Sequence, residues 1–140
     1  VRPLDPSDRD AIHALDTQSY GAHRVEILDR MLELSEGVVA DRDGEGSGFA
    51  LMRPFGRGWV IGPIVAEDDQ MAMHLCTPLV QRREGQYLRV DTPRQDEQFK
   101  AFLSAAGLGV VDTVTEMRIG PVRRSTEGAM LYGLAAHSLG

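Results

Sequence analysis

Residues 38–65, VVADRDGEGSGFALMRPFGRGWVIGPIV, contain three short runs of β-prone residues separated by turn signals. The runs cover 38–40, 49–52 and 59–61, and the last one continues to Val65. Gly-containing stretches at 43–46 and 56–58 favour tight turns, so we expect three antiparallel strands. Pro63 cannot donate a hydrogen bond to a neighbouring strand, so the third strand should lie at an edge, be bulged or splay from a neighbour there.

Helical patterns lie on both sides of these strands. Asp5-Pro6-Ser7-Asp8 combines a capping residue, a Pro at the first helical position and an acid that can reach back to the cap. The spacing of apolar residues predicts helices over 5–20, 24–34, 68–83 and 95–106, and further strands over 1–4, 87–90, 110–119 and 131–135. Pro78 should kink or break the third helix near Thr77. Strands interleaved with helices on a partly antiparallel sheet indicate an α/β or α+β sandwich.

Length and charge limit the classes of function. The 140 residues suit one domain, and the formal net charge of −6 argues against nucleic acid or an anionic membrane as partner. No apolar run approaches the roughly 20 residues of a membrane span, no signal peptide is visible, and the single Cys76 excludes an internal disulfide. We therefore expect a cytoplasmic protein. Because the chain opens at Val1 without a Met, we expect either a processed product or one part of a longer polypeptide.

Several strings, together with the order of elements, resemble the GNAT superfamily of acetyl-CoA-dependent N-acyltransferases. Residues 1–4 with the following Asp-Pro-led helix resemble the first strand and helix of that family, and residues 102–108, FLSAAGL, resemble the end of its last helix. Residues 16–32, residues 61–68 and the ending Leu139-Gly140 look like the C-terminal domain of bacterial two-domain GNAT proteins.

This resemblance implies a mixed, mostly antiparallel twisted sheet flanked by about four helices. Residues 1–140 would be a single GNAT-like domain, the C-terminal half of a longer two-domain protein, with a second GNAT domain as its partner in the same chain. The implied reaction transfers an acetyl group from acetyl-CoA to a small-molecule or peptide amine. The coenzyme would be held along the strand backbone at Ile64, Val65 and Ala66.

Two positions depart from the family pattern. The family holds the coenzyme pyrophosphate with a loop of the type Gln/Arg-x-x-Gly-x-Gly/Ala, whereas residues 67–72 read EDDQMA, with three acids and no Gly, Arg or Lys. Leu103 stands where the family has the Tyr that protonates the leaving thiolate, and Asp96 where it often has an Asn. The alternative hypothesis is therefore a catalytically silent GNAT-fold domain that packs on a competent one and shapes its acceptor site.

Asp91 and Glu116 are the candidate catalytic residues. Each is expected in or at the end of a strand beside the acceptor cleft, where a carboxylate could hold or deprotonate a substrate amine. The alternative interpretation is a pair of solvent-facing carboxylates. No metal is expected: residues 41–46 resemble a calcium loop, but Met52 stands at its twelfth position, and His74 and Cys76 do not share a helix face.

Overall fold

The computed structural model describes residues 1–42, 45–56, 58–90, 97–105 and 129–133. These residues form a mixed α/β domain. Its elements in chain order are β1 (Arg2–Pro3), the 3-10 turn η1 (Pro6–Asp8), α1 (Arg9–Tyr20), α2 (Val25–Leu34), β2 (Glu36–Arg42), β3 (Glu45–Phe55), β4 (Gly58–Ala66), α3 (Asp69–Arg82), β5 (Leu88–Val90), α4 (Glu97–Ala105) and β6 (Met130–Gly133).

The six strands of the described residues form one sheet. Its order is β1-β2-β3-β4-β5, and β6 also pairs with β4. All pairings are antiparallel except that of β4 with β5, which is parallel. The expected mixed, mostly antiparallel sheet with four helices is confirmed.

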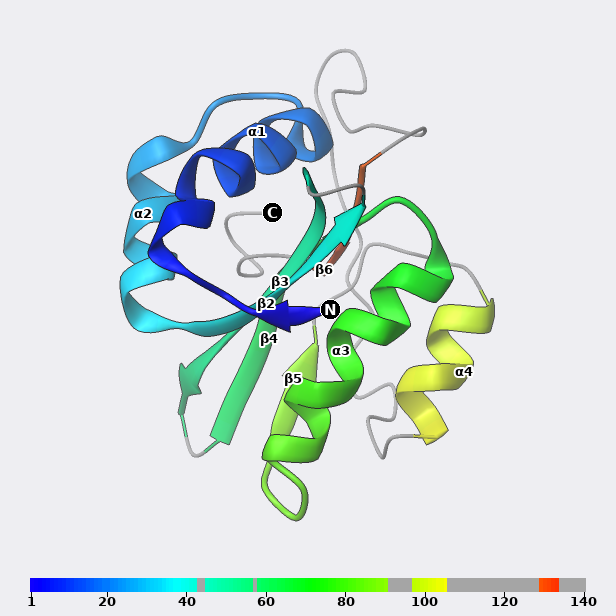
Figure 1. Cartoon of the computed structure of the whole chain (residues 1–140). Helices are drawn as coiled ribbons and strands as arrows, with labels where there is room; N and C mark the ends of the chain where they lie inside the picture. Colours follow the sequence, from blue (N-terminus) through cyan, green and yellow to red (C-terminus); the bar gives the residue numbers. More distant parts are fainter. Residues whose placement is uncertain (43–44, 57, 91–96, 106–128, 134–140) are drawn as a thin grey trace, which may run out of the picture.

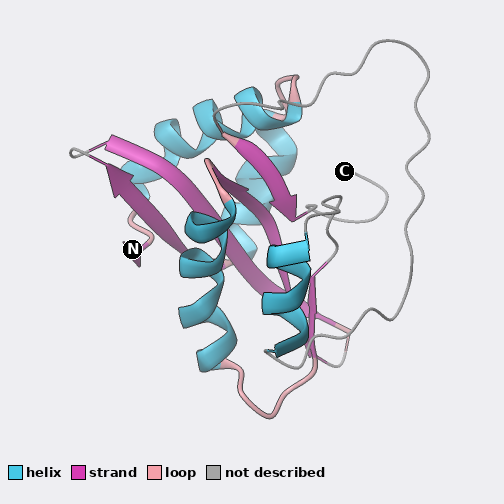
Figure 2. Cartoon of the chain, turned by 90° about the vertical axis from the view of Figure 1, so that its right-hand side faces the viewer, coloured by secondary structure: helices cyan, strands magenta, loops and turns pink. Residues whose placement is uncertain are grey.

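The sheet lies between two layers of helices (Figures 1 and 2). Helices α1 and α2 cover one face, and α3 and α4 cover the other. Alternate residues of a strand point to opposite faces, so Val38 packs in the core with α3 while Val39 packs in the core with α1 and α2. Burial on both faces explains why the central strands are almost continuously apolar.

The beginning of the first helical segment follows the predicted capping pattern. Asp5 accepts hydrogen bonds from the N–H of Ser7, and Asp8 accepts one from the N–H of Asp5, which completes a capping box. The helix ends where the sequence indicated: Gly21 adopts φ +90°, and its N–H donates to the carbonyl of Thr17.

Pro63 marks the place where β4 changes its neighbour. Residues Trp59–Ile61 pair with β5, and Ile64–Ala66 pair with β6 on the same side of the strand. The register with β3 also shifts between Ile61 and Ile64, and the buried guanidinium of Arg53 donates to the carbonyl of Gly62 there. The expected bulge and splay are therefore both present, and β4 is a central strand.

Other predicted elements differ in detail. Helix α3 continues through Pro78, so of the kink or break expected near Thr77 the break does not occur. Leu75, Cys76 and Leu79 are fully buried on both sides of Pro78, and this packing holds the helix together across the missing N–H. The strand expected over 110–119 lies outside the described residues.

Candidate functional site

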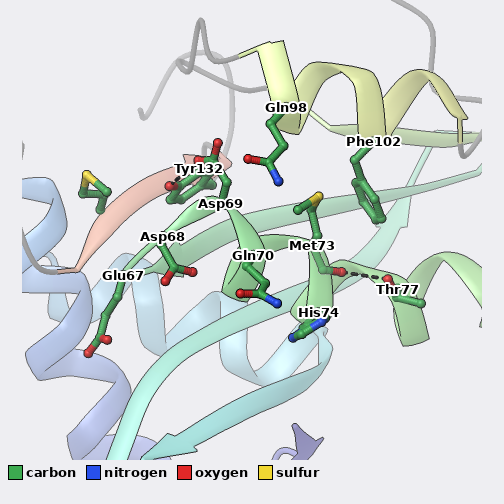
Figure 3. A pocket seen from close by; sticks show the side chains of 11 residues that line it. Glu67, Asp68, Asp69, Gln70, Met73, His74, Thr77, Gln98, Phe102 and Tyr132 are labelled. Carbon is green, nitrogen blue, oxygen red and sulfur yellow. Dashed lines mark hydrogen bonds between the residues drawn. The ribbon is translucent and has the colours of Figure 1, made fainter.

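A cleft of about 930 Å³ opens between α3, α4 and β6 (Figure 3). Its described lining is Glu67, Asp68, Asp69, Gln70, Met73, His74, Thr77, Gln98, Phe102, Met130 and Tyr132. One end carries carboxylates from the start of α3. Further along α3 and on α4 the lining is mixed, with Met73 and the ring of Phe102 among the polar side chains of His74, Thr77 and Gln98.

The acids at the start of α3 have separate partners. Asp68 is the N-cap, and its Oδ1 accepts the N–H of Met71 at 2.7 Å. Glu67 forms an ion pair with Arg42 at 2.6 Å. Among the described residues that line the cleft, none is Lys or Arg. A phosphate group at this helix start would meet carboxylates, one of which already occupies the Met71 N–H.

Tyr132 connects β6 to this helix start. Its hydroxyl donates to Oδ1 of Asp69 at 2.7 Å, and its buried ring packs edge-on against Phe99 with centroids 5.2 Å apart. The register between β4 and β6 shifts here: Ile64 faces Gly133 and Val65 faces Leu131, so Tyr132 lies at the irregularity between these two pairs. A bulge of this kind re-aims a side chain, and here it brings Tyr132 to the cleft.

The residues expected to hold the coenzyme lie in the middle of the sheet. Ile64, Val65 and Ala66 are fully buried. Ile64 and Val65 pair with β3 on one side, and all three residues pair with β6 on the other. The start of α3 follows directly in the chain and its residues line the cleft, whereas the backbone of Ile64–Ala66 takes part in strand pairing.

The remaining positions discussed from the sequence lie either outside the described residues or in the core. Asp91 and Glu116, the candidate catalytic carboxylates, lie outside the described residues, as does Asp96. Leu103 is buried in the core beside α3, so the position of the family's Tyr is a packing position here. Burial raises the pKa of the Cys76 thiol to about 12, which makes it an apolar core group at neutral pH.

Sequence reasoning did not assign Tyr132, Phe102 or Gln98 to a site. Asp69 and Tyr132 are 63 positions apart, so no local spacing connects them. The only available signal was the polar composition of residues 67–70, which pointed to this helix start. In the described part of the chain, no three His, Cys, Asp or Glu side chains converge as metal ligands, and no helix is long and apolar enough to cross a membrane.

Comparison with known proteins identifies the fold family. A family model described as an acetyltransferase (GNAT) domain matches residues 12–133. Among curated proteins, none matches the chain significantly. YhbS, a GNAT family N-acetyltransferase of Escherichia coli solved in complex with CoA, superposes with a TM-score of 0.52 at 20% identity, over 58% of this chain and 53% of that one. The chain thus spans about half the length of YhbS.

A second solved structure matches over a longer range. TTHA1254 from Thermus thermophilus, solved as a point mutant, superposes with a TM-score of 0.56 at 20% identity. The match covers 87% of this chain and 98% of that one. At this level of identity, both structures show a shared fold.

Proposed function

Because the chain belongs to the GNAT acetyltransferase family, we propose that it takes part in transferring an acetyl group from acetyl-CoA to an amine, and that its own part is to bind the amine acceptor. The observation that supports this role most directly is the acidic cleft at the start of α3. An alkylamine is a cation at neutral pH, and it must be held near its reaction partner before it loses a proton.

The arrangement of the cleft suits a cation attached to an apolar body. Asp68 and Asp69 supply negative charge, and the charge of Asp69 is matched within the described residues by a neutral hydroxyl rather than by a cation. The Met73 thioether, one turn further along α3, and the Phe102 ring of α4 provide apolar surface beside these acids. An ammonium group near Asp69 would leave its hydrocarbon chain against this surface.

Calorimetric titration with n-hexylamine at pH 7 tests this role, with the neutral 1-hexanol as the matched probe. We expect saturable binding of the amine and none of the alcohol. Asp69→Asn should weaken amine binding about tenfold, because a hydrogen bond to a charged group is worth about 1.5 to 3 kcal/mol. Asp10→Asn, on the exposed side of α1 across the sheet, is the matched control and should leave the affinity unchanged.

Equal binding of the alcohol and the amine, or equal effects of the two Asp→Asn changes, would contradict the acceptor-binding role. In the first case the cleft would recognise only the apolar chain. In the second case the amine would be attracted by the net charge of the whole protein rather than by the start of α3.

A further inference from the structure

The backbone edge beside the cleft is already paired on both sides. On one side, Ile64 and Val65 of β4 pair with Ala50 and Phe49 of β3. On the other side, the same two residues pair with Gly133 and Leu131 of β6. A ligand that binds along a strand needs an edge with free N–H and C=O groups, as in the addition of a strand to a sheet. This part of β4 offers no such edge.

We infer that β6 takes the place along β4 that the family resemblance gives to the coenzyme, so that this domain does not bind acetyl-CoA by itself. This inference rests on the proposed function, because the proposed function is what identifies the coenzyme as acetyl-CoA. The acetyl-CoA is then bound by a second, competent GNAT domain, and this domain contributes the acceptor cleft.

Close packing fixes β6 against β4. A Cβ atom added at Gly133 would lie 2.7 Å from Cδ1 and 2.8 Å from Cγ1 of Ile64, so any larger residue there would force the buried Ile64 side chain to shift. The neighbouring side chains of β6 enter opposite layers. Leu131 packs in the core under α1 and α2, and Tyr132 packs in the core with α3 and α4. A ligand would have to remove both side chains from these cores to reach the backbone of β4.

The start of α3 disfavours the coenzyme for a second, electrostatic reason. The positive end of a helix binds phosphate through free N–H groups. Here Oδ1 of Asp68 accepts the N–H of Met71, and Asp69 lies beside it with its carboxylate bonded to Tyr132. The helix start therefore already holds an anion of its own, and a pyrophosphate would add repulsion to the loss of that cap.

Two measurements on the unmodified chain test the inference together. Calorimetric titration with acetyl-CoA up to about 1 mM, the weak end of specific binding, should give no saturable heat. Hydrogen exchange of peptides covering Ile64–Ala66 should be slow and unchanged by acetyl-CoA, because the strand pairing itself protects these amides. Saturable binding at micromolar acetyl-CoA would overturn the inference.

A variant of Tyr132 tests whether its hydrogen bond to Asp69 helps to keep β6 paired with β4. Tyr132→Phe removes the hydroxyl that donates to Asp69 and leaves the ring, so the amides of Ile64–Ala66 should exchange several-fold faster. Tyr87→Phe is the matched control, since Tyr87 is exposed and does not line the cleft, and it should leave this exchange unchanged. Unchanged exchange in Tyr132→Phe would show that its bond to Asp69 does not hold β6.

Failure of this inference and failure of the proposed function give different results. Acetyl-CoA binding together with selective n-hexylamine binding would overturn only the statement that β6 replaces the coenzyme. Absence of both would overturn only the acceptor-binding role.

Discussion

Carboxylates at the helix starts of this domain accept hydrogen bonds from two kinds of donor. Asp5 and Asp68 accept backbone N–H groups, as their positions before the helices predict. Asp8 and Asp69 also accept side-chain donors, Arg2 and Tyr132, which come from other elements. The caps could be predicted from the sequence because they depend on neighbours within a few residues. The partner of Asp69 could not, since Tyr132 is 63 positions away and only the fold brings the two side chains together.

The Asp8 carboxylate should make the free energy of unfolding depend on pH in the acidic range. Two hydrogen bonds from Arg2 hold the pKa of this carboxyl below its usual range. Its contribution is therefore present above the unfolded pKa of about 3.9 and is lost as the pH falls through the lower folded value. We expect Asp8→Asn to lower the free energy of unfolding by about 1 kcal/mol at pH 7, since Arg2 is partly exposed.

Urea denaturation of Asp8→Asn and of the unmodified chain at pH 7 and at pH 3 checks this expectation. The difference between the two proteins should shrink at pH 3, where the Asp8 carboxylate begins to be protonated in the unmodified chain. A difference that grows on acidification would contradict the assignment.

Asp16 and Arg24 form a buried ion pair, with side chains that are 1% and 5% exposed. Two hydrogen bonds of 2.8 Å join them, and the Arg24 guanidinium lies 4.0 Å from the centre of the Tyr20 ring. Arg24→Met would leave a buried carboxylate without its cation, so we expect a loss of about 3 kcal/mol in the free energy of unfolding.

The double variant Asp16→Leu with Arg24→Met removes both charges and should regain most of that loss. Chemical denaturation of the single and double variants measures the difference. If the double variant is less stable than Arg24→Met alone, the two side chains stabilise the fold through their packing rather than through their charges.

At the scale of elements, β3 fits closely between its neighbours at Gly48. A Cβ atom there would lie 2.7 Å from the sulfur of Met71 and 2.8 Å from the carbonyl oxygen of Val65. The Met71 side chain can move, but the carbonyl belongs to the centre of the sheet. Gly48→Ala should therefore cost about 2 kcal/mol or more, as overpacking does.

Gly46→Ala is the matched control on the same strand. A Cβ at Gly46 would make only ordinary contacts, the nearest with Cβ of Ala11 at 3.5 Å. Thermal unfolding should give a melting temperature for Gly46→Ala close to that of the unmodified chain and a clearly lower one for Gly48→Ala. Equal shifts would mean that β3 can move away from β4 and α3 at little cost.

The two prolines show what local patterns can predict about elements. The missing N–H of Pro63 correctly predicted a change in strand pairing, because ladder hydrogen bonds are formed residue by residue. The same reasoning at Pro78 predicted a kink or a break, and α3 does not break there. The buried residues around Pro78 pack against the sheet, and this tertiary contribution outweighs the local cost.

At the scale of the molecule, the layers could be predicted and the position of β6 could not. The alternation and helical spacing of apolar residues determine which faces are buried, and the resemblance implied a mixed, mostly antiparallel sheet flanked by helices. Ile64 and Gly133 are 69 positions apart, and the pairing between them depends on close approach rather than on any local pattern. The acids at 67–69 could be found from the sequence, but Tyr132 and Phe102 become part of the same cleft only in the fold.

The central claim is that the cleft at the start of α3 binds a cationic amine and not acetyl-CoA. Nitrogen-15 correlation spectra of the labelled chain, recorded with n-hexylamine and separately with acetyl-CoA, test it most directly. We predict that the amine shifts the amide signals of Asp69, Gln70 and Tyr132 in a saturable manner, and that acetyl-CoA leaves Ile64–Ala66 and the start of α3 unshifted. Saturable shifts of Ile64–Ala66 by acetyl-CoA, with no response to the amine, would contradict the account.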